Sequence, residues 1–265
     1  MTTRLQDLLV GFRGLKLDSK PVIVHASLSA FGQVQGGAET LVSALLAVFD
    51  SVVMPAFTYK TIIIPSSGPE TNAIIYGSGA DANRMAEFFD PQMPADPLMG
   101  AVAEALRKHP RAKRSTHPIL SYTGVKAKAA LAAQTLADPL APIGVLAKQD
   151  GWVLLLGVDH TVNSSIHYAE KLAGRKQFVR WALTPQGVRE CPGFPGCSAG
   201  FHAIAPEVER DTQRVRIGNA AVQAVPLKML FKAVIERIKN DPLALLCQQA
   251  DCPRCNEIRL LNAVG

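Results

Sequence analysis

The sequence is poor in aromatic residues and in charge, and it contains no long hydrophobic run. Aromatic side chains make up 6% and charged side chains 19% of its 265 residues, whereas 48% are hydrophobic. This composition is typical of a globular chain that buries its own core, and it excludes a disordered, collagen-like or coiled-coil protein. No apolar stretch approaches the ~20 residues that a bilayer span needs, and the first residues lack the apolar stretch of a signal peptide. We therefore expect a cytoplasmic protein without a membrane partner.

Cysteine is scarce and unevenly placed. There are five cysteines, an odd number, and four of them follow residue 195. In a reducing compartment this skew favours a metal site over disulfides. Cys247, Cys252 and Cys255 are closely spaced, and one more thiolate would complete the tetrahedral set that structural zinc prefers. Cys197 is the expected fourth ligand because a flexible glycine precedes it, and Cys191 is the reserve. Reduced, unligated thiols are the alternative.

The usual nucleotide-binding fingerprints are also missing. The chain has neither Gly-x-Gly-x-x-Gly nor a Walker loop. The main sequence signals for binding a dinucleotide or a nucleoside triphosphate are therefore missing. A different glycine-bearing loop, residues 25–37, joins an expected strand to an expected helix. Backbone N–H groups in such a loop can hold an anion, although the glycines also serve a tight turn.

The excess positive charge is concentrated in one short run. The formal net charge is +6, and five basic residues without an acidic neighbour stand within eight positions: Arg107, Lys108, Arg111, Lys113 and Arg114. A nucleic-acid surface normally interleaves aromatics and spreads its basic residues along a face. The compact run therefore fits a small anionic ligand better, and a solvated helix end is the alternative.

Strand and helix patterns alternate along the chain. A β-branched run at 21–28, the glycine loop, a helical pattern at 38–49 and a second strand at 51–57 form a βαβ unit, which predicts an α/β fold with parallel strands. Further strands are expected at 119–124, 152–158, 176–190 and 213–225, and further helices at 100–108, 127–136, 143–148, 164–173 and 227–239. Residues 60–100 have the composition of a long functional loop.

The first candidate site follows the strand that ends at Val158. His167 and Glu170 are three residues apart, so a helix places both on one face, where the carboxylate can orient the imidazole. Ligands often bind beyond the carboxyl ends of parallel strands. An ordinary surface pair at helical spacing is the alternative. His117 is a second candidate; Pro118 biases it toward an extended conformation, and a loop histidine in solvent is its alternative.

Seven of these segments occur in a fixed order between about residues 22 and 175. They are His25-Ala-Ser-Leu-Ser-Ala-Phe-Gly-Gln-Val-Gln-Gly-Gly-Ala-Glu-Thr40, Val53-Met-Pro-Ala-Phe-Thr58, Phe89-Asp-Pro91, Met99-Gly-Ala-Val-Ala-Glu-Ala-Leu-Arg107, Arg114-Ser-Thr-His-Pro-Ile-Leu-Ser121, Leu154-Leu-Leu-Gly-Val158 and Asn163-Ser-Ser-Ile-His-Tyr-Ala-Glu170. The ordered set resembles the aminoglycoside N3-acetyltransferase family, also called antibiotic N-acetyltransferases. The resemblance implies acetyl-coenzyme A as donor, a primary amine as acceptor, and a mixed α/β fold with helices flanking the sheet, distinct from the GNAT acetyltransferases.

The resemblance also implies roles for particular residues. It places the donor along 25–37 and 114–121, with His25, Ser27, Leu28, Ser29, Gly36, Gly37, Arg114, Ser115 and Ser121 as binding residues. It places the chemistry near 167–170, with His167 as general base, Glu170 orienting it, and His117 as the competing base. Residues 1–175 would form the donor-binding and catalytic core, and 176–265 the C-terminal part of the same fold with the cysteine-rich site. The acceptor is expected to enter past Asp81, Glu87, Asp90 and Asp96, away from the basic run.

Two departures from the family pattern keep other functions open. Members typically carry a further His before a Ser-Pro-Leu-like segment, but residues 136–144 contain no His, and Ala141 stands where Ser is usual. The cysteine-rich tail is absent from the well-known resistance enzymes. The first alternative is therefore a zinc-stabilised coenzyme A-binding protein that kept the fold and lost catalysis, and a weaker one is a nucleic-acid-binding protein.

Overall fold

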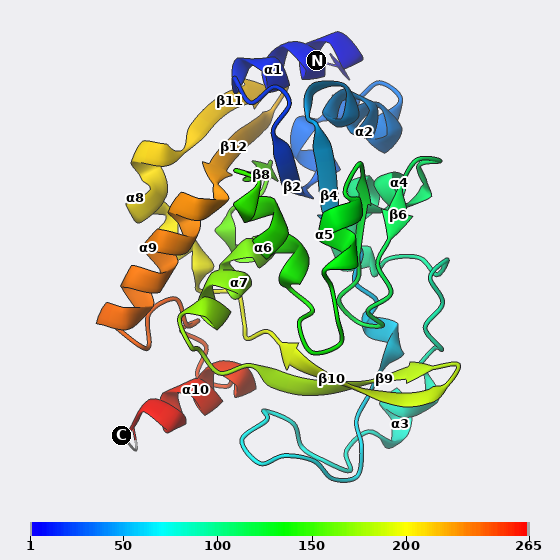
Figure 1. Cartoon of the computed structure of the whole chain (residues 1–265), viewed down its shortest axis with the longest axis vertical. Coiled ribbons are helices and arrows are strands. Elements are labelled where there is room, and N and C mark those ends of the chain that lie inside the picture. The colour runs from blue at the N-terminus through cyan, green and yellow to red at the C-terminus, as the bar shows by residue number, and fades with distance from the viewer. Residues whose placement is uncertain (1, 264–265) are drawn as a thin grey trace.

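A seven-stranded mixed sheet forms the centre of the molecule (Figure 1). The computed structural model describes residues 2–263. The strand order is β11 (Gln213–Ile217), β12 (Ala220–Pro226), β8 (Trp152–Leu156), β2 (Pro21–Ala26), β4 (Ser51–Pro55), β7 (Tyr122–Val125) and β6 (Lys113–Arg114). Strand β2 runs parallel to both of its neighbours, whereas the other pairings are antiparallel. The expected mixed α/β sheet, with its parallel βαβ unit, is confirmed.

Helices cover both faces of this sheet because its central strands are apolar on both sides. Alternate residues of β2 point to opposite faces, so Val22 and Val24 pack in one core cluster and Ile23 in the other. The first cluster includes residues of α1 (Leu5–Gly14), α2 (Gly37–Val48) and α4 (Gly100–Lys108). The second includes residues of α5 (Lys128–Ala132), α6 (Ala141–Lys148), α7 (Ser164–Leu172) and α9 (Leu227–Asn240).

A second sheet joins the C-terminal part of the chain to the long loop after β4. It consists of β10 (Gly187–Phe194), β9 (Phe178–Thr184) and β5 (Ile62–Ile63), all antiparallel. The β9–β10 hairpin lies beyond one end of the main sheet, near α3 (Ala80–Arg84) and α10 (Pro253–Ala263) (Figure 1). The remaining short elements are β1 (Thr2–Thr3), which pairs with β3 (Gln33–Val34), and α8 (Ala205–Val208). Residues after 175 therefore contribute strands to both large sheets.

Most expected elements are present, and the differences have local causes. The segment expected as strand at 176–190 is a hairpin that continues to Phe194, with its turn at residues 185–186, just before Gly187, where φ is +100°. The helix expected over 127–136 ends at Ala132. Gln134 then turns inward, where its side-chain amide donates to the carbonyls of Leu120 and Pro139. No helix within residues 2–263 is long and apolar enough to cross a membrane.

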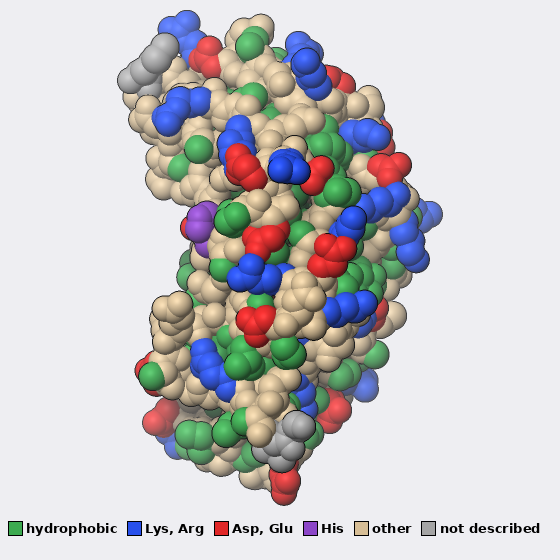
Figure 2. Space-filling model, turned by 90° about the vertical axis from the view of Figure 1, so that its left-hand side faces the viewer, with side chains coloured by type: hydrophobic (Ala, Val, Ile, Leu, Met, Phe, Trp, Pro, Cys, Tyr) green, Lys and Arg blue, Asp and Glu red, His purple; other side chains and the backbone are tan. Residues whose placement is uncertain are grey.

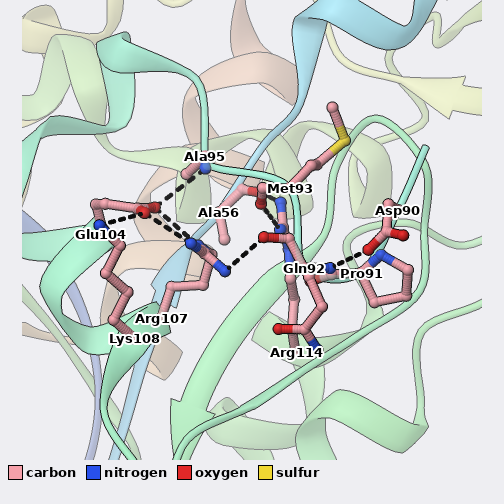
Figure 3. Close-up of polar contacts among 10 residues, drawn as sticks. All are labelled: Ala56, Asp90, Pro91, Gln92, Met93, Ala95, Glu104, Arg107, Lys108 and Arg114. Carbon is pink, nitrogen blue, oxygen red and sulfur yellow. Dashed lines mark hydrogen bonds and ion pairs between the residues drawn. The ribbon is translucent and has the colours of Figure 1, made fainter. Parts of the chain in front are cut away.

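The two half-buried arginines of the basic run, Arg107 and Arg114, make hydrogen bonds within the protein (Figure 3). The Arg107 guanidinium binds both carboxylate oxygens of Glu104, at 2.8 and 2.7 Å, and the Gln92 carbonyl. The Arg114 guanidinium donates to the carbonyls of Ala56, Pro91 and Met93 and to the Ser121 hydroxyl. Burial, and then the charge of Arg107, lowers the pKa of Arg114 to about 10, so it stays charged at neutral pH. Arg114 thus ties the loop at 91–93 to the end of β4.

These contacts predict that Arg114 acts on stability. We expect Arg114→Ala to lower the free energy of unfolding by about 2–4 kcal/mol, because hydrogen bonds to a charged group are lost and carbonyls are left unpaired. Arg111→Ala is the matched control, since it removes the same charge from an exposed position of the same run. Urea unfolding of both variants measures the difference, and equal stabilities would contradict the assignment.

Candidate functional site

A cavity of about 900 Å³ opens at the carboxyl ends of the central parallel strands. His25 and Ala26 from the end of β2, Pro55 from the end of β4, and Val158 after β8 line it. Its other walls come from the glycine loop, from α4, from α7, and from the C-terminal part of the chain through Phe194, Pro195, Gly196, Ser198 and Arg254. This is the position at which α/β sheets usually bind ligands.

His167 lines this cavity and is paired with a buried carboxylate. The Asn163 side chain caps α7 by accepting from the Ser165 N–H at 3.0 Å, which starts the helix at Ser164. His167 Nδ1 then lies 2.8 Å from Glu170 Oε2, and Glu170 is 2% exposed. Because Nδ1–H donates to the carboxylate, the Nε2 lone pair is left to take a proton from a ligand in the cavity. The structure thus brings together the pair expected from the spacing.

Arg175 fixes the carboxylate, and nothing in the local sequence pattern indicates this role. Its Nη1 lies 2.7 Å from Glu170 Oε1, and its Nη2 donates to the carbonyls of Pro242 and Ala244, both at 2.8 Å. Both partners of the ion pair have side chains only 2% exposed. The Phe201 ring packs edge-on against the His167 ring at 4.6 Å. The dyad is therefore held from two sides, by Arg175 five residues after Glu170 and by Phe201 from a later segment.

Two further histidines near the dyad are neutral at physiological pH. His25 Nε2 lies 3.4 Å from the Ser164 hydroxyl, and burial, followed by the charges of His160 and His167, lowers its pKa to about 3. Burial and the charge of His202 lower the pKa of His160 to about 4. An imidazole with such a low pKa is a weak general base near pH 7, so His167 is the better candidate.

His117, the second candidate base, does not line the cavity. The side chain is buried, and its Nδ1 accepts from the backbone N–H groups of Ile119 and Leu120, at 3.1 and 2.9 Å. The proton of the neutral ring therefore resides on Nε2, which makes that nitrogen a donor. Burial lowers the pKa of His117 to about 4. These contacts fit a residue that shapes the turn before β7.

The rest of segment 114–121 also lies outside the cavity wall, and its contact with the donor stays a prediction. The Ser115 hydroxyl accepts from the Tyr122 N–H at 2.8 Å, and the Ser121 hydroxyl donates to the Ala56 carbonyl at 2.7 Å. Arg114 is engaged as described above. The motif folds a mostly buried corner, because the side chains of Arg114, Ser115, His117 and Ser121 are hydrogen-bonded within the protein.

The glycine loop, in contrast, contributes a long stretch of the wall. His25, Ser27, Leu28, Ser29 and Gly37 all line the cavity. Gly36 does not, but its φ of +76°, followed by +62° at Gly37, turns the chain into α2. Helix α2 thus begins at the cavity, with unpaired backbone N–H groups in its first turn.

The acidic and basic groups expected around the acceptor and the donor are elsewhere. None of Asp81, Glu87, Asp90 and Asp96 lines the cavity, and neither does any residue of the basic run. Residues 136–144, where the family's additional His is missing, are likewise absent from its wall. Figure 2 shows Lys and Arg interspersed with Asp and Glu on the face that it draws. This mixture differs from the continuous basic stripe of a nucleic-acid surface.

Four cysteines converge in a separate cluster beside the cavity. The Sγ atoms of Cys197, Cys247, Cys252 and Cys255 all lie within 4.8 Å of one another. Cys191 is not among them; it lies on β10 with its Sγ near the Arg189 carbonyl. A tetrahedral zinc with Zn–S bonds of about 2.3 Å places its sulfurs about 3.8 Å apart, so this donor set fits zinc. The geometry selects Cys197 over Cys191 as the fourth thiol.

The buried histidines predict an acid-sensitive fold. A histidine with a lowered folded-state pKa binds its proton first in the unfolded chain, so stability falls as the pH drops from 6.5 towards 4. Each such group contributes up to about 1.4 kcal/mol per pH unit in this window. We expect His117→Asn, whose amide oxygen can replace Nδ1 as acceptor, to flatten the slope by about one proton. Urea unfolding across the window, with His109→Asn, outside the buried set, as control, tests this; an unchanged slope for His117→Asn would contradict it.

Known proteins resemble this chain in sequence and in fold. A family model described as aminoglycoside 3-N-acetyltransferase matches residues 23–239. Aminoglycoside N(3)-acetyltransferase VII of Streptomyces paromomycinus is 34% identical over 240 residues, which cover 82% of each protein. The apoenzyme structure of aminoglycoside acetyltransferase AAC(3)-IVa matches with a TM-score of 0.79 at 23% identity, covering 98% of both chains. The structure of AAC-IIIb, a binary complex with CoASH, matches with a TM-score of 0.74 at 22% identity, covering 91% of this chain and 97% of that one.

These similarities extend well beyond the seven segments noted in the sequence. The family model continues through α9, so it includes the two strands, β11 and β12, that complete the main sheet. The matched region contains the cavity wall apart from Arg254, the glycine loop and the His167–Glu170 pair, but ends before the last three cysteines. The chain belongs to the aminoglycoside 3-N-acetyltransferase family.

Proposed function

We propose that this protein transfers an acetyl group from acetyl-coenzyme A to a primary amine of an aminoglycoside-like or other amino-sugar acceptor. The observation that carries the proposal is the His167 imidazole, which lines the cavity while its Nδ1 is held 2.8 Å from the buried Glu170 carboxylate. Family membership supplies the reaction class, and this pair supplies the proton acceptor that the reaction needs.

The reaction is an attack of a neutral amine on a thioester. The amine nitrogen bonds to the carbonyl carbon while His167 Nε2 takes its proton. The C–S bond then breaks, and the departing thiolate of coenzyme A takes the proton from the imidazolium. Glu170 stabilises the imidazolium, and Arg175 keeps the carboxylate in place. No covalent intermediate on the protein is required, and His25, with a pKa of about 3, stays neutral throughout.

The glycine loop is the proposed donor site. Ser27, Leu28 and Ser29 line the cavity next to the end of β2, and α2 begins there with N–H groups free for an anion. Backbone N–H groups of this loop would also stabilise the oxyanion that forms on the thioester carbonyl. The binary complex of AAC-IIIb with CoASH makes coenzyme A the appropriate test ligand.

The proposed base predicts a selective loss of turnover. We expect His167→Ala and Glu170→Gln to lower kcat by about 10²–10⁴-fold, as is typical of lost acid–base assistance, with coenzyme A binding retained. Release of free thiol from acetyl-coenzyme A, measured across a panel of primary amines, gives kcat, and calorimetry gives donor affinity. His117→Asn is the control and should keep wild-type kcat. Wild-type turnover by His167→Ala, or no thiol release with any amine, would refute the proposal.

We also propose that the four-cysteine cluster holds one structural zinc ion. Support comes from the mutual Sγ separations and from the burial of Cys247, Cys252 and Cys255. Four thiolates would fill every coordination position, which leaves none for a substrate. The metal would join the segment after β10 to the chain end around α10. Retention of reduced thiols of this kind supports a cytoplasmic location.

Metal loss should therefore destabilise the fold without altering the chemistry. Elemental analysis of the purified protein should find about one zinc per chain. Cys252→Ser should lose the metal and lower the melting temperature, because binding energy in a structural site is folding energy. Cys191→Ser, outside the cluster, should retain it. Metal-free wild-type protein with four titratable thiols and unchanged stability would show that the site is not a metal site.

A further inference from the structure

The cavity contains no carboxylate, although an aminoglycoside acceptor carries several ammonium groups. Among residues 2–263, no Asp or Glu lines the cavity, and Arg254 is its one lining side chain with a permanent charge. A ligand with several positive charges binds most readily where a negative potential replaces the water that the ligand loses. The charge that serves such an acceptor therefore has to come from groups behind the wall.

The four-cysteine cluster lies directly behind one part of this wall. Gly196 and Ser198, which flank Cys197, both line the cavity, and so does Arg254, which stands between two cluster cysteines. Because adjacent Cα atoms are about 3.8 Å apart, the cluster lies within about 10 Å of the wall. This distance is comparable with the Debye length in physiological salt, so a charge on the cluster can be felt in the cavity.

With zinc bound, the cluster is anionic. Four thiolates around one Zn²⁺ leave a formal excess of about two negative charges. Around the last three cysteines, Arg254 and Arg259 are matched in number by Asp251 and Glu257. Arg180 on β9 is the other cation close to Arg254, since both guanidinium groups approach the same aromatic ring, and it offsets about one of the two charges. The region behind the wall thus keeps a negative excess that no lining side chain shows.

Burial favours the action of this charge on the cavity. Cys247, Cys252 and Cys255 are at most 8% exposed, and charges interact more strongly through the protein interior than through bulk water. Neutral oxygens complete the surroundings: the hydroxyls of Tyr59 and Ser198 line the cavity, and burial raises the pKa of Tyr59 to about 12. Such oxygens can accept hydrogen bonds from ammonium groups.

The cluster lies on the part of the wall that the proposed donor leaves free. The donor is assigned to the glycine loop, which belongs to the connection between β2 and α2. The cluster instead adjoins the segment after β10 and the first turn of α10. His167, from α7, lines the same cavity. An amine held at the C-terminal wall would therefore share the cavity with the base.

We propose that the zinc–thiolate cluster supplies the negative charge that attracts the ammonium groups of the acceptor, and that Arg254 moderates this attraction. The acceptor contacts the wall and not the metal, because the four sulfurs fill every coordination position. The inference rests on the proposed acetyl transfer and on the proposed zinc site. It narrows the acceptor class to amines with several positive charges.

Two substitutions that change this charge in opposite directions test the proposal by equilibrium binding. Cys197→His replaces one thiolate with a neutral ligand that zinc sites also use, so the metal is kept and one negative charge is lost. It should weaken the binding of kanamycin and gentamicin by about three- to tenfold at low salt. Arg254→Met removes a positive charge and should tighten the binding of both by a similar factor, and Arg254→Glu should tighten it further.

Calorimetry measures these affinities, with coenzyme A saturating in every sample so that the donor's charge is the same throughout. Glucosamine, which has a single ammonium group, should change by about twofold at most in each variant. Glu190→Gln, which removes an exposed carboxylate on β10 outside the cavity, is the charge-matched control and should bind as the wild type does. Elemental analysis confirms that Cys197→His retains zinc; if it does not, the two Arg254 variants decide the outcome.

The proposal is overturned if zinc-loaded Cys197→His binds kanamycin and gentamicin as the wild type does, or if Arg254→Met and Arg254→Glu weaken both. Equal losses for glucosamine and the polycations would also overturn it, because the wall then acts through its shape. Metal-free wild-type protein would remove its basis without affecting the acetyl transfer. Absence of thiol release with every amine, together with the expected opposite shifts in affinity, would refute the transfer and retain the charged site.

Discussion

A single buried carboxylate connects the reactive side chain of this protein to the rest of its fold. Glu170 lies between His167 and Arg175, and Arg175 in turn holds two carbonyls of the segment after α9. Removing one member of such a buried pair typically costs 3–5 kcal/mol, because a charge is left uncompensated. The geometry of the base therefore depends on α7, on Arg175 shortly after it and on the segment that follows α9.

The chain end reaches the cavity by a second route. The cysteine cluster brings the segment after β10 against α10, and in doing so it places Arg254 in the wall that faces the base. The region matched to the family holds the strands of the main sheet, the glycine loop and the His167–Glu170 pair. The tail, which the family model does not include, supplies the one permanent charge of the cavity within residues 2–263.

What the sequence predicted correctly depends on short-range patterns. Apolar runs and glycines predict the βαβ unit, and helical spacing predicts the contact between His167 and Glu170. The close spacing of the tail cysteines predicts that their thiols form one cluster. Tertiary contacts lie beyond such patterns. The isolated motif does not indicate that Arg114 binds three carbonyls or that His117 Nδ1 accepts two backbone N–H groups. Arg175 was missed for the same reason, since its carbonyl partners lie 67 and 69 residues away.

The central claim is that the Glu170 carboxylate acts through a position that Arg175 maintains. The most direct measurement is kcat for Arg175→Met and Arg175→Lys, with the KM for acetyl-coenzyme A determined in the same assays. The account predicts that Arg175→Met lowers kcat by at least about tenfold, a loss of about 1.4 kcal/mol in transition-state stabilisation, with the donor KM unchanged. Arg175→Lys, which can keep the ion pair but not both carbonyl bonds, should recover part of the loss. Wild-type kcat in a folded Arg175→Met protein would contradict the account.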